Sequence, residues 1–348
     1  MLRYLLFAGL FLTSVAGYSQ ISSTFNANAQ GWTAPIANPA IQYSATGGNP
    51  GGYVSGNPYF FVLGAGTIYI PFYFVAPAAY RGNFSTYYNG TLRYDVQQSV
   101  TGAPNQYAEV RIRNTSGQNL YYFPATPNQP AAPPTWSPYS VVFNNTSGFW
   151  KTTNSASGSL ASELQIQNIL SALDTLEIRG LYREANVNAR LDNVIFSPPI
   201  VVTAQPNTVA VCNGVTATFT TAATGNAAIT YRWQFESSPS VWTDLNNGGG
   251  YSNVTTATLS VNTTGNFGAG RYRCRISGTA VVDAFTNAAT LTINALPAAP
   301  GAVGAARCGT GTVTLTAAGG VAGQYRWYTV PTGGTAIAGQ TAGTFTTP

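Results

Sequence analysis

The sequence predicts an all-β protein, and three features of its composition lead to this fold class. Gly (37) and Pro (21) together supply one sixth of the 348 residues, which favours many short strands joined by turns. Charged residues are only 7% of the chain, against about 25% in typical soluble domains. The apolar share of 45% and the aromatic share of 13% are sufficient for packed cores. The length leaves room for two or three domains.

The N-terminal half of the chain alternates strand patterns with turn residues. Alternation of apolar and polar residues predicts strands over 67–75, 91–96, 107–113 and 140–143. In the first of these, the isoleucines and phenylalanines share one face, which we expect in the core: Ile68, Ile70, Phe72 and Phe74. Tyr69 and Tyr73 share the opposite face.

One segment departs from the strand pattern. Apolar residues at helical spacing predict a helix of about three turns: Leu160, Leu164, Ile169, Leu170 and Leu173. Ser162 and Gln165 are spaced as a capping box at its start. Two further strands are predicted over 176–179 and 191–196, so the sheet continues after the helix.

Two features of the composition exclude classes of function. The chain contains no His, which excludes Ser-His-Asp and Cys-His nucleophile pairs and all His-ligated metal sites. The net charge is +5, but 14 of the 15 basic residues are Arg spread singly along the chain. We therefore expect no nucleic-acid partner.

The first residues predict export. Arg3 precedes an apolar run over 4–15 and then small residues, the pattern of a cleaved signal peptide at 1–19. The run is shorter than the roughly 18 to 20 residues that span a bilayer, so we expect a secreted or cell-surface protein with no membrane span after cleavage. Export permits disulfides, and the chain has three cysteines: Cys212, Cys274 and Cys308.

Proline-rich seams at 197–199 and 296–300 divide the chain into domains at 20–197, 200–294 and 301–348. The second and third domains are copies of one module, because Tyr231-Arg232-Trp233 recurs as Tyr325-Arg326-Trp327. The third segment is too short for a whole module, so we expect it to be truncated at residue 348.

The first domain resembles the laminin IV type A domain, also called the laminin B domain. The resemblance rests on short motifs in a fixed order: Ser23-Thr24-Phe25, Gly31-Trp32, 46–53 (TGGNPGGY), Phe74-Val75-Ala76-Pro77, 176–182 (LEIRGLY) and Leu191-Asp192-Asn193-Val194. It implies a jelly-roll β-sandwich similar to carbohydrate-binding modules, found in extracellular matrix and bacterial surface proteins. It implies no catalytic residues.

The second domain resembles an immunoglobulin-like sandwich. Trp233 stands where a Trp packs across the two sheets, and Tyr272 precedes Cys274 by two residues, the tyrosine-corner spacing. The resemblance implies a disulfide from Cys212 to Cys274, although a cysteine of strand B is expected nearer Thr221. Other pieces resemble repeats of secreted proteins of Gram-negative bacteria, which often end in a type IX secretion sorting domain. We therefore expect a C-terminal signal beyond residue 348 that the secretion machinery reads.

Candidate binding residues come from the first domain. Exposed flat rings stack on sugars, and Tyr69, Tyr73, Tyr121 and Trp136 are the candidates for a sugar platform; their alternative is a place in the core. The resemblance to jelly-roll modules points to a structural calcium held by Asp192 with Asn26, against a turn or cap role for Asp192. A glycosidase pair would need two close carboxylates, and Glu109 and Glu177 on predicted strands are the nearest to one.

The sequence therefore predicts a secreted, non-catalytic surface protein without a cofactor other than this calcium. Its jelly-roll would bind a glycan or a matrix-like protein, and its immunoglobulin-like modules would act as spacers. Two alternatives stay open: a purely structural surface spacer, and a binding appendage of a hydrolase encoded beyond residue 348.

Overall fold

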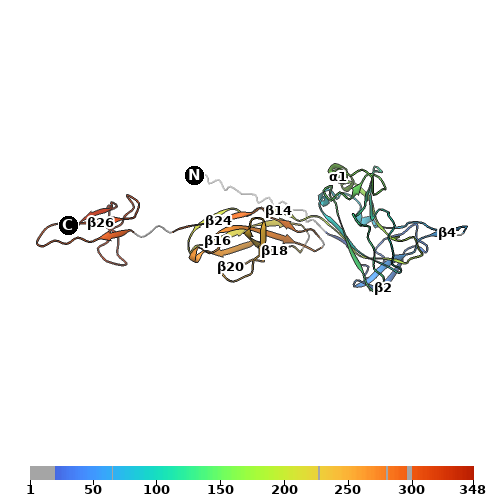
Figure 1. Cartoon of the computed structure of the whole chain (residues 1–348), viewed down its shortest axis with the longest axis horizontal. Helices are drawn as coiled ribbons and strands as arrows, with labels where there is room; N and C mark the ends of the chain where they lie inside the picture. Colours follow the sequence, from blue (N-terminus) through green and yellow to red (C-terminus); the bar gives the residue numbers. More distant parts are fainter. Residues whose placement is uncertain (1–19, 65, 226–227, 280, 296–299) are drawn as a thin grey trace, which may run out of the picture.

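The computed structural model describes residues 20–64, 66–225, 228–279, 281–295 and 300–348 (Figure 1). The described chain is built from β-sheets and one α-helix, which confirms the predicted fold class. The signal peptide predicted at 1–19 lies outside the described residues, as does most of the second proline-rich seam.

Two antiparallel sheets form the first domain. One contains β1 (Ile21–Ser23), β2 (Gln42–Gly48), β3 (Gly51–Gly56), β7 (Thr91–Gln98), β10 (Ser137–Val142) and β13 (Ala189–Ser197), in the order β10-β7-β13-β3-β2 with β1 also on β13. The other contains β6 (Tyr73–Val75), β8 (Val110–Asn114), β9 (Asn119–Tyr122), β11 (Trp150–Lys151) and β12 (Leu173–Arg179), in the order β11-β9-β8-β12-β6. Two 3₁₀ turns, η1 (Ala78–Tyr80) and η2 (Ser85–Tyr87), connect them.

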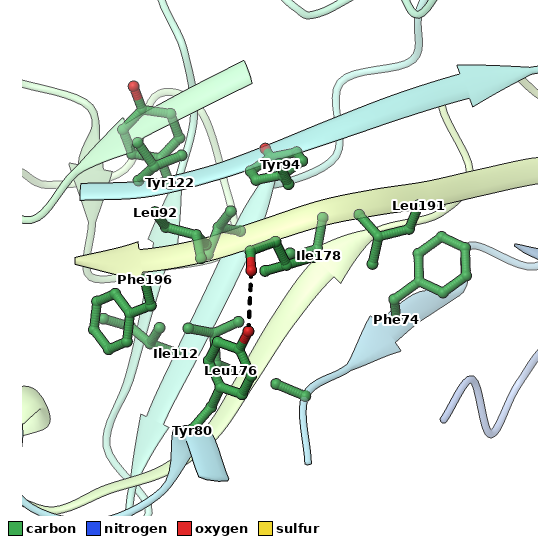
Figure 2. Packing of buried hydrophobic residues seen from close by; sticks show 14 of the residues in the cluster. Phe74, Tyr80, Leu92, Tyr94, Ile112, Tyr122, Leu176, Ile178, Leu191 and Phe196 are labelled. Atoms are coloured by element: carbon green, nitrogen blue, oxygen red, sulfur yellow. Dashed lines mark hydrogen bonds between the residues drawn. The ribbon is translucent and has the colours of Figure 1, made fainter. Parts of the chain in front are cut away.

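The core of this domain lies between the two sheets. Alternate residues of β7 and β13 meet those of β8 and β12, as Leu92, Ile112 and Ile178 show in Figure 2. Two polar side chains in the core have hydrogen-bond partners there: the Tyr80 hydroxyl donates to the Val194 carbonyl at 3.2 Å, and the Trp32 indole donates to Ser23 Oγ at 2.9 Å.

The predicted helix is present as α1 (Glu163–Ser171). Its capping box is confirmed, because Ser162 Oγ accepts from the Gln165 amide and the Gln165 side chain accepts from the Ser162 amide. Ile169 and Leu170 are buried as expected, together with Ile166. Leu164 lies instead on the solvent side of the helix.

The single strand predicted over 67–75 is wrong. Pro71, which has no amide hydrogen to donate, follows β5 (Gly66–Tyr69), and the chain resumes as β6 in a different sheet. β5 pairs with β4 (Phe60–Leu63) in a separate hairpin, so Ile68 is exposed and not in the core. Phe72 and Phe74 are fully buried, as predicted.

The second module is a β-sandwich. One sheet has the order β15-β24-β22-β18-β19, with β23 on β22: β15 (Val209–Cys212), β24 (Ala289–Asn294), β22 (Gly270–Ser277), β18 (Thr230–Ser238), β19 (Val241–Asp244) and β23 (Ala284–Phe285). Facing strands are β16 (Thr216–Thr220), β21 (Thr258–Asn262) and β20 (Tyr251–Ser252), with β14 (Val201–Ala204) on β17 (Ala222–Thr224) and the 3₁₀ turn η3 (Thr264–Asn266).

Two immunoglobulin-like core features predicted for this module are confirmed. Trp233 is fully buried against Phe219, with ring centroids 6.1 Å apart. The Tyr272 hydroxyl donates to the carbonyl of Gly268, four residues upstream, which is the tyrosine-corner hydrogen bond.

The predicted disulfide from Cys212 to Cys274 is wrong, and all three cysteines are free thiols. Cys212 pairs with Asn294 on β24, whereas the pairing of Tyr272 with Ala289 places Cys274 level with residue 287. Seven residues along a strand span ~23 Å, and a disulfide needs Cα atoms within about 7 Å. Cys274 points into the core and Cys212 lies on the surface.

The last segment contains a three-stranded sheet of β25 (Gly301–Val303), β26 (Thr314–Ala318) and β27 (Thr344–Thr346). Trp327, the repeat partner of Trp233, stacks on Phe345 with centroids 5.5 Å apart. Both indoles donate to a backbone carbonyl, that of Thr256 for Trp233 and that of Ala342 for Trp327.

Candidate binding groove on the outer sheet of the first domain

A polar groove of about 270 Å³ crosses the outer face of the β11-β9-β8-β12-β6 sheet. Its side chains come from three adjacent strands and a nearby loop: Arg111, Arg113, Asn119, Tyr121, Asn154, Thr175 and Glu177. We call this set the outer groove.

Strand alternation explains why these residues gather. On β8, Val110 and Ile112 are buried in the core, so Arg111 and Arg113 project to the opposite face. Arg111 is the register partner of both Tyr121 on β9 and Glu177 on β12. One row of side chains therefore runs Tyr121, Arg111, Glu177 across three strands.

Arg111 is held in place from two sides. Its guanidinium carbon lies 3.8 Å from the centroid of the Tyr73 ring, a cation–π contact, and its Nη1 lies 4.0 Å from Glu177 Oε2. The Nε of Arg111 is buried without a hydrogen-bond partner. The groove thus contains a guanidinium that the Tyr73 ring and the Glu177 carboxylate hold in one orientation.

Burial is the largest influence on the pKa values of the acidic side chain and the tyrosine beside Arg111. Desolvation raises the pKa of Glu177, and the charge of Arg111 opposes that rise. Desolvation also raises the pKa of Tyr73 to about 12, again opposed first by Arg111. The Tyr73 hydroxyl donates to the Ala108 carbonyl at 2.8 Å, so it stays protonated beneath the guanidinium.

The four predicted platform aromatics are not brought together. Tyr121 lines the outer groove, and Tyr73 is buried beneath Arg111, where it cannot stack on a ligand. Tyr69 lies on the β4–β5 hairpin. Sequence alternation did not reveal the role of Arg111, because its contacts with Tyr73 and Glu177 join strands that are far apart in sequence.

Trp136 lines a second pocket, wide and open, of about 810 Å³. Its other aromatic wall is Tyr139, and its polar groups are amides and hydroxyls, including those of Asn128 and Gln129. Trp136 itself packs edge-on against Tyr53, with centroids 5.8 Å apart. This pocket is uncharged, in contrast to the outer groove.

Glu109 and Glu177 do not form a carboxylate pair. The Glu109 carboxylate is fully buried, where Tyr94 of the opposite sheet donates to it at 2.7 Å and Tyr182 donates to the same oxygen. Arg179 lies 4.0 Å away. Glu177 instead opens onto the outer groove.

Asp192 is a residue of β13 and contacts the β2–β3 hairpin through Asn49. Its oxygens accept from the backbone amides of Asn49 at 2.6 Å and Asn193 at 2.7 Å, and its register partner is Asp95. Burial raises the pKa of Asp192 to about 6, while the two amides lower it. A buried carboxylate facing a second carboxylate is a place where a cation would relieve repulsion.

Glycines around Asp192 leave room for oxygen atoms. A Cβ at Gly51 would collide with Asn26 Oδ1, and a Cβ at Gly48 would collide with Asp192 Oδ2 and the Gly52 carbonyl. Asn26 and Asp192, predicted together as calcium ligands, therefore both border this hairpin. In the described residues no cluster of three acidic, Cys or His side chains is present, so the donor set is mainly neutral oxygen.

The described residues contain no helix long and apolar enough to cross a membrane.

Comparisons with known proteins agree with this architecture. Residues 73–206 match the family model described as Laminin B (Domain IV), and residues 297–348 match that of the Ig-like domain described as CHU_C associated. No curated protein matches the chain.

Among solved structures, the L4b domain of human laminin alpha-2 is similar at 13% identity and a TM-score of 0.36, covering 52% of this chain and 97% of that domain. An Ig complex of titin M10 and obscurin-like 1 is similar at 21% identity and a TM-score of 0.25, covering 29% of this chain and 99% of that one. The tandem Ig repeats of Dlar are similar at 14% identity and a TM-score of 0.25, covering 33% and 74%. The chain is thus a multidomain protein that carries a laminin B domain followed by an immunoglobulin-like domain of the CHU_C-associated type.

Proposed function

We propose that the laminin B domain is a non-catalytic binding head that recognises glycans through the outer groove, in a secreted protein whose immunoglobulin-like modules act as spacers. Laminin B and Ig-like domains together are the composition of an extracellular multidomain protein. The observation that carries the finer proposal is the row Tyr121, Arg111, Glu177 on one sheet face.

The chemistry of that row suits a sugar. The Tyr121 ring offers an apolar surface with a polar edge, which is how aromatic side chains meet pyranose faces. Arg111 and Asn119 supply donors, and Glu177 supplies acceptors, for ring hydroxyls. Held by Tyr73 and Glu177, Arg111 loses little freedom on binding, which limits the entropic cost.

The test is a glycan and polysaccharide binding screen with the full chain, with and without Ca²⁺. Tyr121→Ala is the groove variant, and Trp136→Ala reports on the open pocket. Binding that is lost in Tyr121→Ala and kept in Trp136→Ala supports the outer groove. The reverse pattern moves the site to the Trp136 pocket, and no binding by the folded chain leaves protein adhesion or a structural spacer as the function.

We also propose a structural calcium at the β2–β3 hairpin. Asp192, Asp95, Asn26 Oδ1 and nearby carbonyls would supply the hard oxygen ligands that calcium prefers. With at most two carboxylates, the affinity is expected in the range of about 10⁻⁴ to 10⁻³ M found for extracellular modules. Calcium at 5 to 10 times that concentration should raise the unfolding midpoint of the wild type and not that of Asp192→Asn, and an equal rise in both would contradict the site.

The proposed secretion by a type IX system rests on the resemblance of the second module to repeats of proteins so exported. A secretion assay in a host with and without that system tests it on the full reading frame.

A further inference from the structure

The β4–β5 hairpin is the most apolar exposed element of the first domain. Its two strands pair only with each other among the described strands, and Figure 1 shows it extending beyond the sheets at the end labelled β4. Exposed fractions rise from 45% at Phe60 to 64% at Val62 and 60% at Leu63. Large exposed apolar patches mark sites of protein or membrane interaction.

The hairpin lies at the end of the domain opposite the next module. β3 ends at Gly56, which pairs with Ala189, the first residue of β13. The last residue of β13, Ser197, continues into the second module. The nine residues of β13, about 30 Å of strand, therefore separate the hairpin from the attachment point. The described part of the second module, which follows Ser197, therefore leaves the tip accessible.

Both faces of the hairpin are apolar. Phe60 and Val62 share one face, while Phe61, Leu63 and Ile68 share the other, and all five side chains are exposed. A groove on a partner protein covers one face of a two-stranded ribbon and leaves the second in water. A lipid phase surrounds both, so the two-faced pattern favours lipid.

The hairpin is apolar at its tip and carries tyrosines at its base, an order that suits a membrane interface. The tip carries Val62 and Leu63, and the base carries Tyr59 and Tyr69, whose rings are apolar and whose hydroxyls are polar. Tyrosine collects at the level of lipid headgroups in membrane proteins. The Tyr69 ring packs on Phe60, with centroids 5.7 Å apart, so the base is a preformed aromatic collar.

The stretch of sequence that contains the hairpin is uncharged. The sequence has no Asp, Glu, Lys or Arg from Tyr4 to Tyr80. An uncharged tip is not attracted electrostatically to anionic lipids, and its insertion requires no desolvation of a charge. The unpaired edges of the hairpin limit the depth, because backbone groups in hydrocarbon must be hydrogen-bonded.

We propose that the β4–β5 hairpin is a lipid-inserting tip that anchors the laminin B domain on a membrane surface, with Val62 and Leu63 at the acyl boundary and the two tyrosines among the headgroups. The proposal is independent of the glycan groove, which lies on the β11-β9-β8-β12-β6 sheet and shares no residue with the hairpin. Adsorption should be insensitive to salt and to anionic lipid content, because no charge takes part.

The test is co-sedimentation of the full chain with phosphatidylcholine vesicles, with and without anionic phosphatidylserine and at low and high salt. The double variant Val62→Asp/Leu63→Asp should lose binding at least tenfold. Leu164→Asp is the matched control, because Leu164 on α1 has the same 64% exposure as Val62. Leu63→Trp should gain fluorescence quenching by brominated lipids, relative to the wild type, when vesicles are present.

Circular dichroism and thermal unfolding of each variant establish that it is folded before binding is compared. No vesicle binding by the wild type, or equal binding by wild type and the double variant, overturns the proposal. Sedimentation velocity without lipid tests whether the hairpin instead joins two copies of the chain. Self-association that the double variant abolishes, together with no vesicle binding, would assign the hairpin to a contact between copies. That outcome also overturns the proposed lipid-inserting tip.

Discussion

Arg111 lies over the ring of Tyr73, with its guanidinium carbon 3.8 Å from the ring centroid. This contact joins β8 to β6, which are separated in the sheet by β12. It buries the tyrosine and fixes the one guanidinium that faces both Tyr121 and Glu177. The energy of the contact can therefore be measured separately from ligand binding.

A double-mutant cycle of Arg111→Ala and Tyr73→Leu should give a coupling free energy of about 0.5–2 kcal/mol. Cation–π pairs that are partly shielded from solvent lie in this range, and the cycle removes the cost of each truncation alone. Urea unfolding of the four proteins measures it. A coupling free energy within error of zero would mean that the contact between Arg111 and Tyr73 does not contribute to stability.

The three thiols should differ in reactivity. Cys212 and Cys308 are exposed, whereas Cys274 is fully buried and desolvation raises the pKa of its thiol to about 12. Titration of the native chain with a chromogenic disulfide reagent should therefore count two fast thiols, and a third only after unfolding. A count of one in both the native and the unfolded chain, which reductant raises to three in the unfolded chain, would show that the Cys212–Cys274 bridge forms after all.

The cysteine result shows where sequence reasoning failed. Trp233 and the Tyr272 corner were predictable because each depends on short spacings that the fold family keeps. The pairing of Cys212 depends instead on which strand Val209–Cys212 joins, and its parallel pairing with β24 is a contact of 82 residues in sequence, from Val209 to Leu291. Local patterns contain no information about that pairing.

In the first domain, too, local features were predictable from the sequence and long-range features were not. The helix and its capping box follow from residues three or four positions apart, so Ser162 and Gln165 were identified correctly. Alternation alone placed Ile68 in the core, because it cannot distinguish a strand inside the sandwich from one in the hairpin beyond Pro71. The outer groove likewise needs the register of β8 with β12, which are about 60 residues apart in sequence and are brought together only in the folded chain.

Glu109 should make the wild type less stable as pH rises, relative to Glu109→Gln. Burial raises the pKa of Glu109 above its ordinary value of 4.5, so the folded state holds a proton that the unfolded state has released. The stabilising contribution is complete below pH 4.5 and is lost as pH rises through the folded pKa. Urea unfolding of both proteins from pH 4 to 8 measures the difference.

The opposite slope, with the wild type gaining stability over the variant as pH rises, would contradict this prediction. It would mean that Arg179 and the two tyrosine donors outweigh burial and lower the pKa of Glu109. Tyr94→Phe, which removes one donor and no charge, separates the hydrogen bond from the ion pair.

Arg179→Lys should destabilise the first domain by about 2–4 kcal/mol, although the charge is kept. The buried guanidinium of Arg179 donates to four backbone carbonyls, those of Asn105, Tyr107, Leu181 and Tyr182. A Lys ammonium has three donors on one nitrogen and cannot bond to all four carbonyls, so at least one buried carbonyl loses its partner. Arg93→Lys, at an exposed position on β7, is the control and should change the free energy of unfolding by less than about 0.5 kcal/mol. Equal effects of the two substitutions would show that Arg179 acts only as a charge beside Glu109, and that the loops at 105–107 and 181–182 are held by other contacts.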